Sequence, residues 1–158
     1  MRIGITGHSN LTPDTVASVA EALREVLAGA KQPLIGLTCL ARGADQVFAR
    51  VVLELGGEIE VVLPASDYRA QKVKPYNAAE FDDLLGKAST VTTMPFDTSN
   101  RDAYIAASEA VLTGVDAMVA VWDGQPSDGH GGTGDVVTAA RSGGLPVTVV
   151  WPAGAARG

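Results

Sequence analysis

A glycine-rich segment is the part of this sequence with the clearest capacity for chemistry. Residues 123–135 contain five glycines, and apolar side chains at helical spacing follow them. Backbone N–H groups without partners, together with the positive end of a helix dipole, favour an anion. The residues that we expect to bind phosphate here are Gly131, Gly132, Thr133 and Gly134. A flexible loop before an ordinary helix is the alternative.

A second polar turn follows the first apolar run of the chain. Gly7 permits a tight turn and close approach of the backbone, while His8 and Ser9 offer side-chain donors. The spacing of glycines differs from G-x-G-x-x-G, so the fingerprint of a dinucleotide cofactor is absent. We expect these three residues to bind a nucleotide or its phosphate.

A third turn, Leu40-Ala-Arg-Gly-Ala-Asp45, follows the second apolar run. Arg42 can pair with a phosphate, and Gly43 lets the backbone come close to a ligand. Asp45 has two interpretations, since an acid at this place either contacts the ligand or stabilises the first turn of a helix. Both interpretations of Asp45 remain open from the sequence.

Aromatic and titratable residues near these turns extend the candidate site. Trp122 and Tyr104 are candidates to contact a base or sugar, with core packing as the alternative for both. The two histidines, His8 and His130, lie in the turns and could face a ligand. Neither has a nearby cysteine or an H-x₃-H spacing, so we predict no metal site and no cofactor.

These turns need a scaffold, and the order of apolar runs predicts one. Short β-rich runs alternate with segments of helical periodicity, which is typical of βαβ units and a mostly parallel sheet. The predicted strands are Arg2–Thr6, Leu34–Leu40, Glu58–Leu63, Thr90–Met94, Ala117–Trp122 and Val147–Trp151. The predicted helices are Thr12–Gly29, Val47–Leu55, Ala78–Lys87, Arg101–Thr113 and Asp135–Arg141. The fold class is therefore α/β, a Rossmann-like three-layer sandwich with about six strands.

Composition limits the classes of protein and partner. The chain has 158 residues, of which 46% are hydrophobic and 19% charged, and this fits one domain spanning residues 1–158. A formal net charge of −6 predicts repulsion of a nucleic-acid backbone, so nucleic acid is not the expected partner. No basic leader or long apolar run is visible, which favours a cytoplasmic protein without a membrane anchor. The single cysteine, Cys39, is expected to be a buried thiol in a reducing compartment.

Two segments carry little pattern. Residues 66–76 form either a loop or lid over the site or a plain solvated connection. Residues 153–158, at the end of the chain, are expected to fray.

The three turns together resemble the SLOG superfamily, the Rossmann-like group that includes LOG-type nucleotide phosphoribohydrolases, the DprA core and nucleotide sensors. Leu40–Asp45 is similar to the S-G-x-A-x-G-x-D pattern of DprA-like domains, with Thr38-Cys39 in place of Ser-Gly. Gly131–Gly134 is similar to the phosphate-binding G-G-T element, and Ile5–His8 to the first turn of small bacterial SLOG proteins. The resemblance implies a nucleotide-binding domain that pairs into a homodimer through its helices.

One departure from the LOG pattern bears on catalysis. The pattern P-G-G-x-G-T-x-x-E places its glutamate where this chain has Val136, with Asp135 one position earlier. Nucleotide binding, as in a sensor, is therefore the leading hypothesis. The alternative is an N-glycosidase acting on nucleotides, as in LOG enzymes or nucleoside deoxyribosyltransferases, with Asp135, Asp123 and Asp45 as candidate catalytic carboxylates. A weaker alternative is single-stranded DNA binding of the DprA type.

Overall fold

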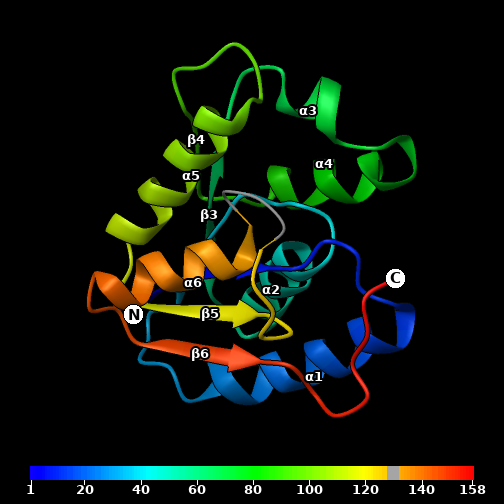
Figure 1. Cartoon of the computed structure of the whole chain (residues 1–158), viewed down its shortest axis with the longest axis vertical. Coiled ribbons are helices and arrows are strands. Elements are labelled where there is room, and N and C mark those ends of the chain that lie inside the picture. Colours follow the sequence, from blue (N-terminus) through cyan, green and yellow to red (C-terminus); the bar gives the residue numbers. More distant parts are fainter. Residues whose placement is uncertain (128–131) are drawn as a thin grey trace.

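The apolar runs form the strands of one parallel sheet. In the computed structural model, which describes residues 1–127 and 132–158, the order of strands in that sheet is β4-β3-β2-β1-β5-β6 (Figure 1). The strands are β1 (Arg2–Gly7), β2 (Ile35–Thr38), β3 (Glu58–Leu63), β4 (Thr90–Thr93), β5 (Ala117–Val121) and β6 (Val147–Val150). Each pair of neighbouring strands runs parallel. The order reverses between β1 and β5, and this defines a topological switch point.

Helices cover both faces of the sheet and give three layers. The helices are α1 (Pro13–Ala28), α2 (Ala44–Glu54), α3 (Tyr68–Lys72), η1 (Pro75–Asn77, a 3₁₀ turn), α4 (Ala78–Gly86), α5 (Arg101–Thr113) and α6 (Thr133–Ser142). One layer of core, around Phe48, Leu23 and Ile59, lies under α1, α2 and α4. The other layer, around Val111, Met118 and Ala140, lies under α5 and α6. The predicted fold class, a Rossmann-like α/β sandwich with six parallel strands, is confirmed.

Two glycines let the layers approach the sheet closely. A Cβ atom on Gly4 would lie 2.7 Å from a methyl group of Val111 on α5, and one on Gly36 would lie 2.8 Å from the Phe48 ring on α2. Such distances are shorter than van der Waals contact, so larger residues would push a helix away from the sheet. These two glycines therefore allow the short distance between the sheet and the helices on each of its faces.

The structure corrects the expectation for the end of the chain. Residues 153–158 are tied down along the first turn, because the amide of Thr12 donates to the Ala156 carbonyl at 3.2 Å. The amide of Ala156 in turn donates to the Thr15 hydroxyl at 2.9 Å. The prediction of a frayed end was wrong, because long-range backbone pairing of this kind leaves no local pattern of apolar residues.

Residues 66–76 also contain more order than the sequence indicates. They carry the short helix α3 and the start of η1, and Tyr68 is buried against Phe81. A five-residue helix with one buried side chain has no detectable apolar period, and the pattern analysis missed it for that reason.

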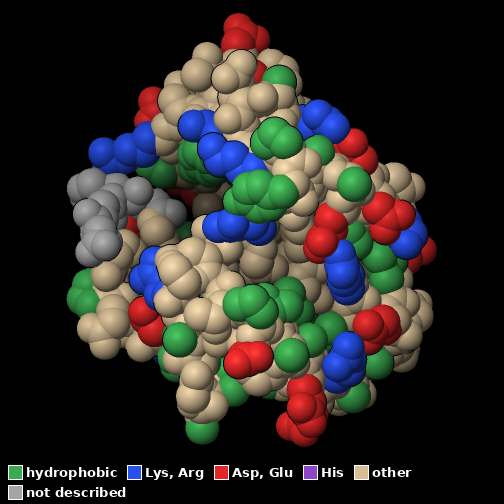
Figure 2. Space-filling model, turned by 90° about the vertical axis from the view of Figure 1, so that its right-hand side faces the viewer, with side chains coloured by type: hydrophobic (Ala, Val, Ile, Leu, Met, Phe, Trp, Pro, Cys, Tyr) green, Lys and Arg blue, Asp and Glu red, His purple; other side chains and the backbone are tan. Residues whose placement is uncertain are grey.

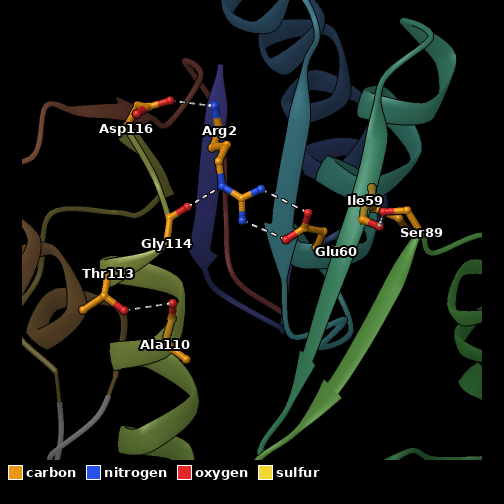
Figure 3. Close-up of polar contacts among 8 residues, drawn as sticks. All are labelled: Arg2, Ile59, Glu60, Ser89, Ala110, Thr113, Gly114 and Asp116. Carbon is orange, nitrogen blue, oxygen red and sulfur yellow. Dashed lines mark hydrogen bonds and ion pairs between the residues drawn. The ribbon is translucent and has the colours of Figure 1, made fainter.

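A polar cluster closes the edge of the sheet where the strands begin. The Arg2 guanidinium forms two hydrogen bonds with the Glu60 carboxylate, at 2.8 and 3.0 Å, and donates to the Gly114 carbonyl at 2.7 Å (Figure 3). The Arg2 amide donates to the Asp116 carboxylate at 2.9 Å. Polar groups at this edge therefore form hydrogen bonds with one another.

Within the described residues, no helix is both long and apolar enough to span a membrane.

Candidate functional site

A large cavity opens at the switch point, where β1 and β5 end. Its volume is about 610 Å³, and segments from separate strands line it. Figure 2 shows this edge of the molecule, where Lys and Arg side chains surround a hollow. Ligands of open parallel sheets bind in the crevice at such a point, beyond the carboxyl ends of the strands. We call it the main cavity. Its lining includes, of the predicted site residues, Gly7, His8, Ser9, Asp45, Tyr104, Trp122, Gly132, Thr133 and Gly134.

The turn after β1 packs directly against the start of α2. A Cβ atom on Gly7 would lie 2.5 Å from the Ala44 Cβ, so only glycine fits here. Gly43 has a φ of 87°, and a Cβ atom on it would lie 2.7 Å from the His8 carbonyl oxygen and 2.8 Å from the Ser9 α-carbon. The amide of Ala44 donates to the His8 carbonyl at 3.2 Å. Both glycines thus bring two of the predicted turns together, although Gly43 itself does not line the main cavity.

His8 joins three strand ends beneath the cavity. Its Nε2 accepts a hydrogen bond from the Asp123 amide at 3.1 Å, and its ring meets the Trp151 ring edge-on with centroids 5.6 Å apart. Desolvation lowers the pKa of His8, and the nearby Arg157 charge lowers it further, while Asp123 opposes both. A neutral imidazole fits a nitrogen that accepts an amide proton. The His8 ring therefore connects the end of β1 to the segments that follow β5 and β6.

The N-terminus of α6 forms one wall of the cavity. Gly132, Thr133 and Gly134 all line it, and the Ser127 hydroxyl accepts a hydrogen bond from the Asp135 amide at 3.3 Å. The positive end of the helix dipole thus faces the cavity. Gly131 and His130, which the sequence also singles out, lie outside the described residues.

Asp45 is the one carboxyl group among the described residues that line the main cavity. It lies in the first turn of α2, 7% exposed, and accepts a hydrogen bond from the Ala41 amide at 3.3 Å. Burial raises the pKa of Asp45 to about 7, despite further hydrogen bonds from the Cys39 amide and Thr38. The residue therefore holds the turn before the helix and also lines the cavity, and its contact with a ligand stays a prediction.

Aromatic side chains form the remaining walls. The Tyr68 ring lies 6.3 Å from the Tyr104 ring, centroid to centroid, and both line the cavity. The Trp122 indole donates to the Gln125 carbonyl at 2.9 Å, which fixes the start of the glycine-rich segment. Cys39 also lines the cavity, and burial raises the pKa of its thiol well above the usual range. The side chain is only partly buried, so the expectation of a buried thiol was wrong in part. A thiol that stays protonated is a poor nucleophile.

Three predicted residues point elsewhere. Arg42 lies outside the main cavity, where its guanidinium contacts the Tyr76 ring. Asp123 bonds to the Gln125 amide and to His8, and these contacts lower the pKa of Asp123. Asp135 lines a separate groove between α5 and α6.

The cavity also contains a cation that pattern analysis missed. Among the described residues lining it, Arg157 carries the one Lys or Arg side chain. Its guanidinium donates to the Asn10 side chain at 3.1 Å and lies 3.5 Å from the Asp123 carboxylate. The sequence offered no signal for this placement, because it depends on how the end of the chain folds back.

Comparisons with known proteins define the class of fold. No family model matches the chain, and no curated protein is significantly similar in sequence. DNA processing protein A (DprA) from Streptococcus pneumoniae matches with a TM-score of 0.72 at 14% identity, over 96% of this chain and 50% of that one. DprA from Helicobacter pylori, whose single-stranded DNA binding mode was described, matches with a TM-score of 0.69 at 14% identity. The match covers 99% of this chain and 68% of that one. The molybdenum cofactor carrier protein from Chlamydomonas reinhardtii matches with a TM-score of 0.58 at 18% identity, over 94% of this chain and 74% of that one.

At these identities the likenesses show the fold alone, a Rossmann-like α/β sandwich, and this is the fold that the resemblance of the sequence motifs implied. This chain spans half the length of the pneumococcal DprA, so the likeness concerns one part of that protein. Two matched proteins are DprA, and the expectation that nucleic acid is not a partner has no support from the comparisons. That expectation used the net charge of the whole chain, and net charge does not describe how cations gather at one edge.

Proposed function

We propose that the main cavity binds a nucleotide, with its phosphate at the N-terminus of α6. The single observation that carries the proposal is the convergence of the turns after β1 and β5 with the starts of α2 and α6 on one cavity. A volume of about 610 Å³ lies within the range of small-molecule sites. Helix N-termini stabilise phosphate groups through their amides and dipole.

The walls divide the ligand between polar and aromatic parts. Thr133, Gly134 and Arg157 lie around the proposed phosphate position, and they supply amides and one positive charge. Tyr68, Tyr104 and Trp122 supply the aromatic surface that a base or sugar packs against. Binding without turnover, as in a nucleotide sensor, is the form of the function that we favour.

The test is calorimetry with a panel of 5′-mononucleotides and the variant Thr133→Asp. An acid at the first position of α6 favours the helix but repels a phosphate, so the variant separates binding from folding. We expect it to weaken binding at least about tenfold, because the added carboxylate repels the phosphate at close range. Thr12→Asp, the same change before α1 and outside the main cavity, is the control and keeps wild-type affinity. Uniform absence of binding to the wild-type protein would overturn the proposal.

A second candidate function, cleavage of an N-glycosidic bond, is favoured by Asp45. A carboxyl group with a pKa of about 7 inside the cavity holds a proton near neutral pH, as a general acid for a departing base must. If this function is correct, wild-type protein releases free base from a 5′-mononucleotide and Asp45→Asn abolishes the release. Chromatography that finds no free base with any nucleotide would exclude it.

We also infer that the protein pairs into a homodimer, as the SLOG resemblance implies. Light scattering during gel filtration would then give twice the chain mass of 16.2 kDa. The mass of a single chain at micromolar concentration would contradict a stable dimer.

A further inference from the structure

A second cavity adjoins the main cavity and plays no part in the function proposed above. Its volume is about 350 Å³, and it lies between the turn after β2 and the segment from α3 to η1. Four residues line both cavities, namely Ser9, Ala41, Tyr68 and Tyr104. A ligand that leaves the main cavity over Tyr104 therefore enters this second cavity directly.

Positive charge gathers in the second cavity. Arg42, Lys72 and Lys74 line it, and the described lining contains no Asp or Glu. None of these three forms an ion pair with another described residue, whereas the neighbouring Arg69 pairs with Asp82 at 2.7 Å. In a chain with a net charge of −6, this concentration of cations without acids favours an anionic ligand.

An aromatic ring accompanies the cations. The Tyr76 side chain is 71% exposed, and the Arg42 guanidinium lies 5.5 Å from its ring centroid and donates to its hydroxyl. A large exposed ring that is held in place offers a surface on which a base can stack. Tyr104, 37% exposed, lies on the boundary with the main cavity.

The walls of the second cavity are held by buried contacts. Gln46 is 2% exposed and forms two reciprocal hydrogen bonds with Asn77, each 2.9 Å long. Its amide also donates to the carbonyl of Leu40, whose left-handed φ of 55° is unfavourable for a bulky residue. The network fixes η1 to the turn after β2, so the second cavity has a defined shape without a ligand.

We propose that the second cavity binds the second phosphate-bearing unit of a dinucleotide whose first unit occupies the main cavity. This inference rests on the proposed function. Cations alone would also suit the polyphosphate of a single nucleotide, but a polyphosphate has no base that could stack on an exposed tyrosine ring. A second nucleotide uses both features, since its phosphate meets Lys72 and Lys74 and its base stacks on Tyr76.

Calorimetry with two sets of probes tests the proposal. The probes are the 5′-mononucleotides and the four 5′-phosphorylated deoxydinucleotides that repeat one base. We expect the best dinucleotide to bind at least about tenfold tighter than its mononucleotide, because stacking and one phosphate contact are added. The double variant Lys72→Gln/Lys74→Gln, and separately Tyr76→Ala, each remove most of this advantage and leave mononucleotide affinity within about twofold.

The control is Lys31→Gln/Lys87→Gln, which removes two exposed lysines outside both cavities and keeps the dinucleotide advantage. Mononucleotide binding without a dinucleotide advantage would overturn this inference and leave the proposed function standing. A triphosphate that binds as tightly as the dinucleotide and is insensitive to Tyr76→Ala would assign the cavity to a polyphosphate. A twelve-nucleotide single strand that binds more than about tenfold tighter than the dinucleotide would replace the proposal with single-stranded DNA binding. Absence of all binding would overturn both proposals.

Discussion

Asp45 has its carboxyl group in the wall of the main cavity, and burial raises its pKa to about 7 from an unfolded value near 3.8. Between these values the folded protein holds a proton that the unfolded chain has released. Stability from this group is therefore greatest below pH 4 and is lost as the pH rises toward 7. The shift of about three pH units corresponds to at most about 4 kcal/mol in the free energy of unfolding.

The variant Asp45→Asn removes this titration. We expect its free energy of unfolding, relative to wild type, to increase from pH 5 to pH 8, as measured by urea unfolding at each pH. Asp102→Asn, which neutralises an exposed acid in the first turn of α5, serves as the control for the loss of one negative charge. A constant difference between Asp45→Asn and wild type would show that the Asp45 pKa is not raised.

Gly7 is required by packing as well as by any ligand. A Cβ atom there would lie 2.5 Å from the Ala44 Cβ and 2.9 Å from the Val121 Cβ. We expect Gly7→Ala to lower the free energy of unfolding by about 2 kcal/mol, the usual cost of overpacking. Gly86→Ala, whose Cβ would meet no atom within 4 Å, should have little effect in the same urea experiment. Equal stabilities of the two variants would refute the close contact at Gly7.

Residue types and spacing predicted part of the candidate site. Gly7 and Thr133 could be found because parallel strands end at one edge, so the turns that follow them must converge. The positions of Arg42 and Arg157 could not be found in this way. Arg42 is held by Tyr76, and Arg157 is brought to the cavity by the folded-back end of the chain, and neither contact has a local pattern.

At the scale of elements, the Gln46–Asn77 pair joins α2 to η1. Removing either side chain leaves a buried amide with fewer partners, so Gln46→Ala should lower the free energy of unfolding by about 2 kcal/mol. Asn77→Ala should cost less, because Asn77 is only partly buried. In a double-mutant cycle, we expect a coupling of about 1 kcal/mol. Additive effects of the two substitutions would show that the reciprocal hydrogen bonds contribute nothing.

The elements that were predicted best have strong apolar patterns and clear boundaries. β3 and α5 match their predicted ranges, Glu58–Leu63 and Arg101–Thr113, because a run of buried apolar positions defines the strand and a sharp N-cap defines the helix. The N-cap of α5 is Asn100, whose side chain accepts a hydrogen bond from Ala103. The apolar stripe of α2 begins at Val47, three residues after the helix does, because its first turn buries Asp45 and Gln46 beside the small Ala44.

At the scale of the whole molecule, the Arg2 cluster and the two cavities occupy opposite edges of the sheet. The Arg2 cluster lies where the strands begin (Figure 3), and the residues that line both cavities lie where they end. The fold could be predicted as a whole because the alternation of strands and helices admits few other arrangements. The clustering of positive charge at the second cavity could not be predicted, because the cations that line it lie in separate parts of the chain, from Arg42 to Lys74.

The most direct test of the central claim is a titration of ¹⁵N-labelled protein with 5′-mononucleotides, followed by NMR. If a phosphate binds at the N-terminus of α6, the largest amide shifts occur at Gly7, Ser9 and Gly132–Gly134, while Asp116 at the opposite edge stays unchanged. Shifts confined to the groove between α5 and α6, or no shifts with any mononucleotide, would contradict a nucleotide site in the main cavity.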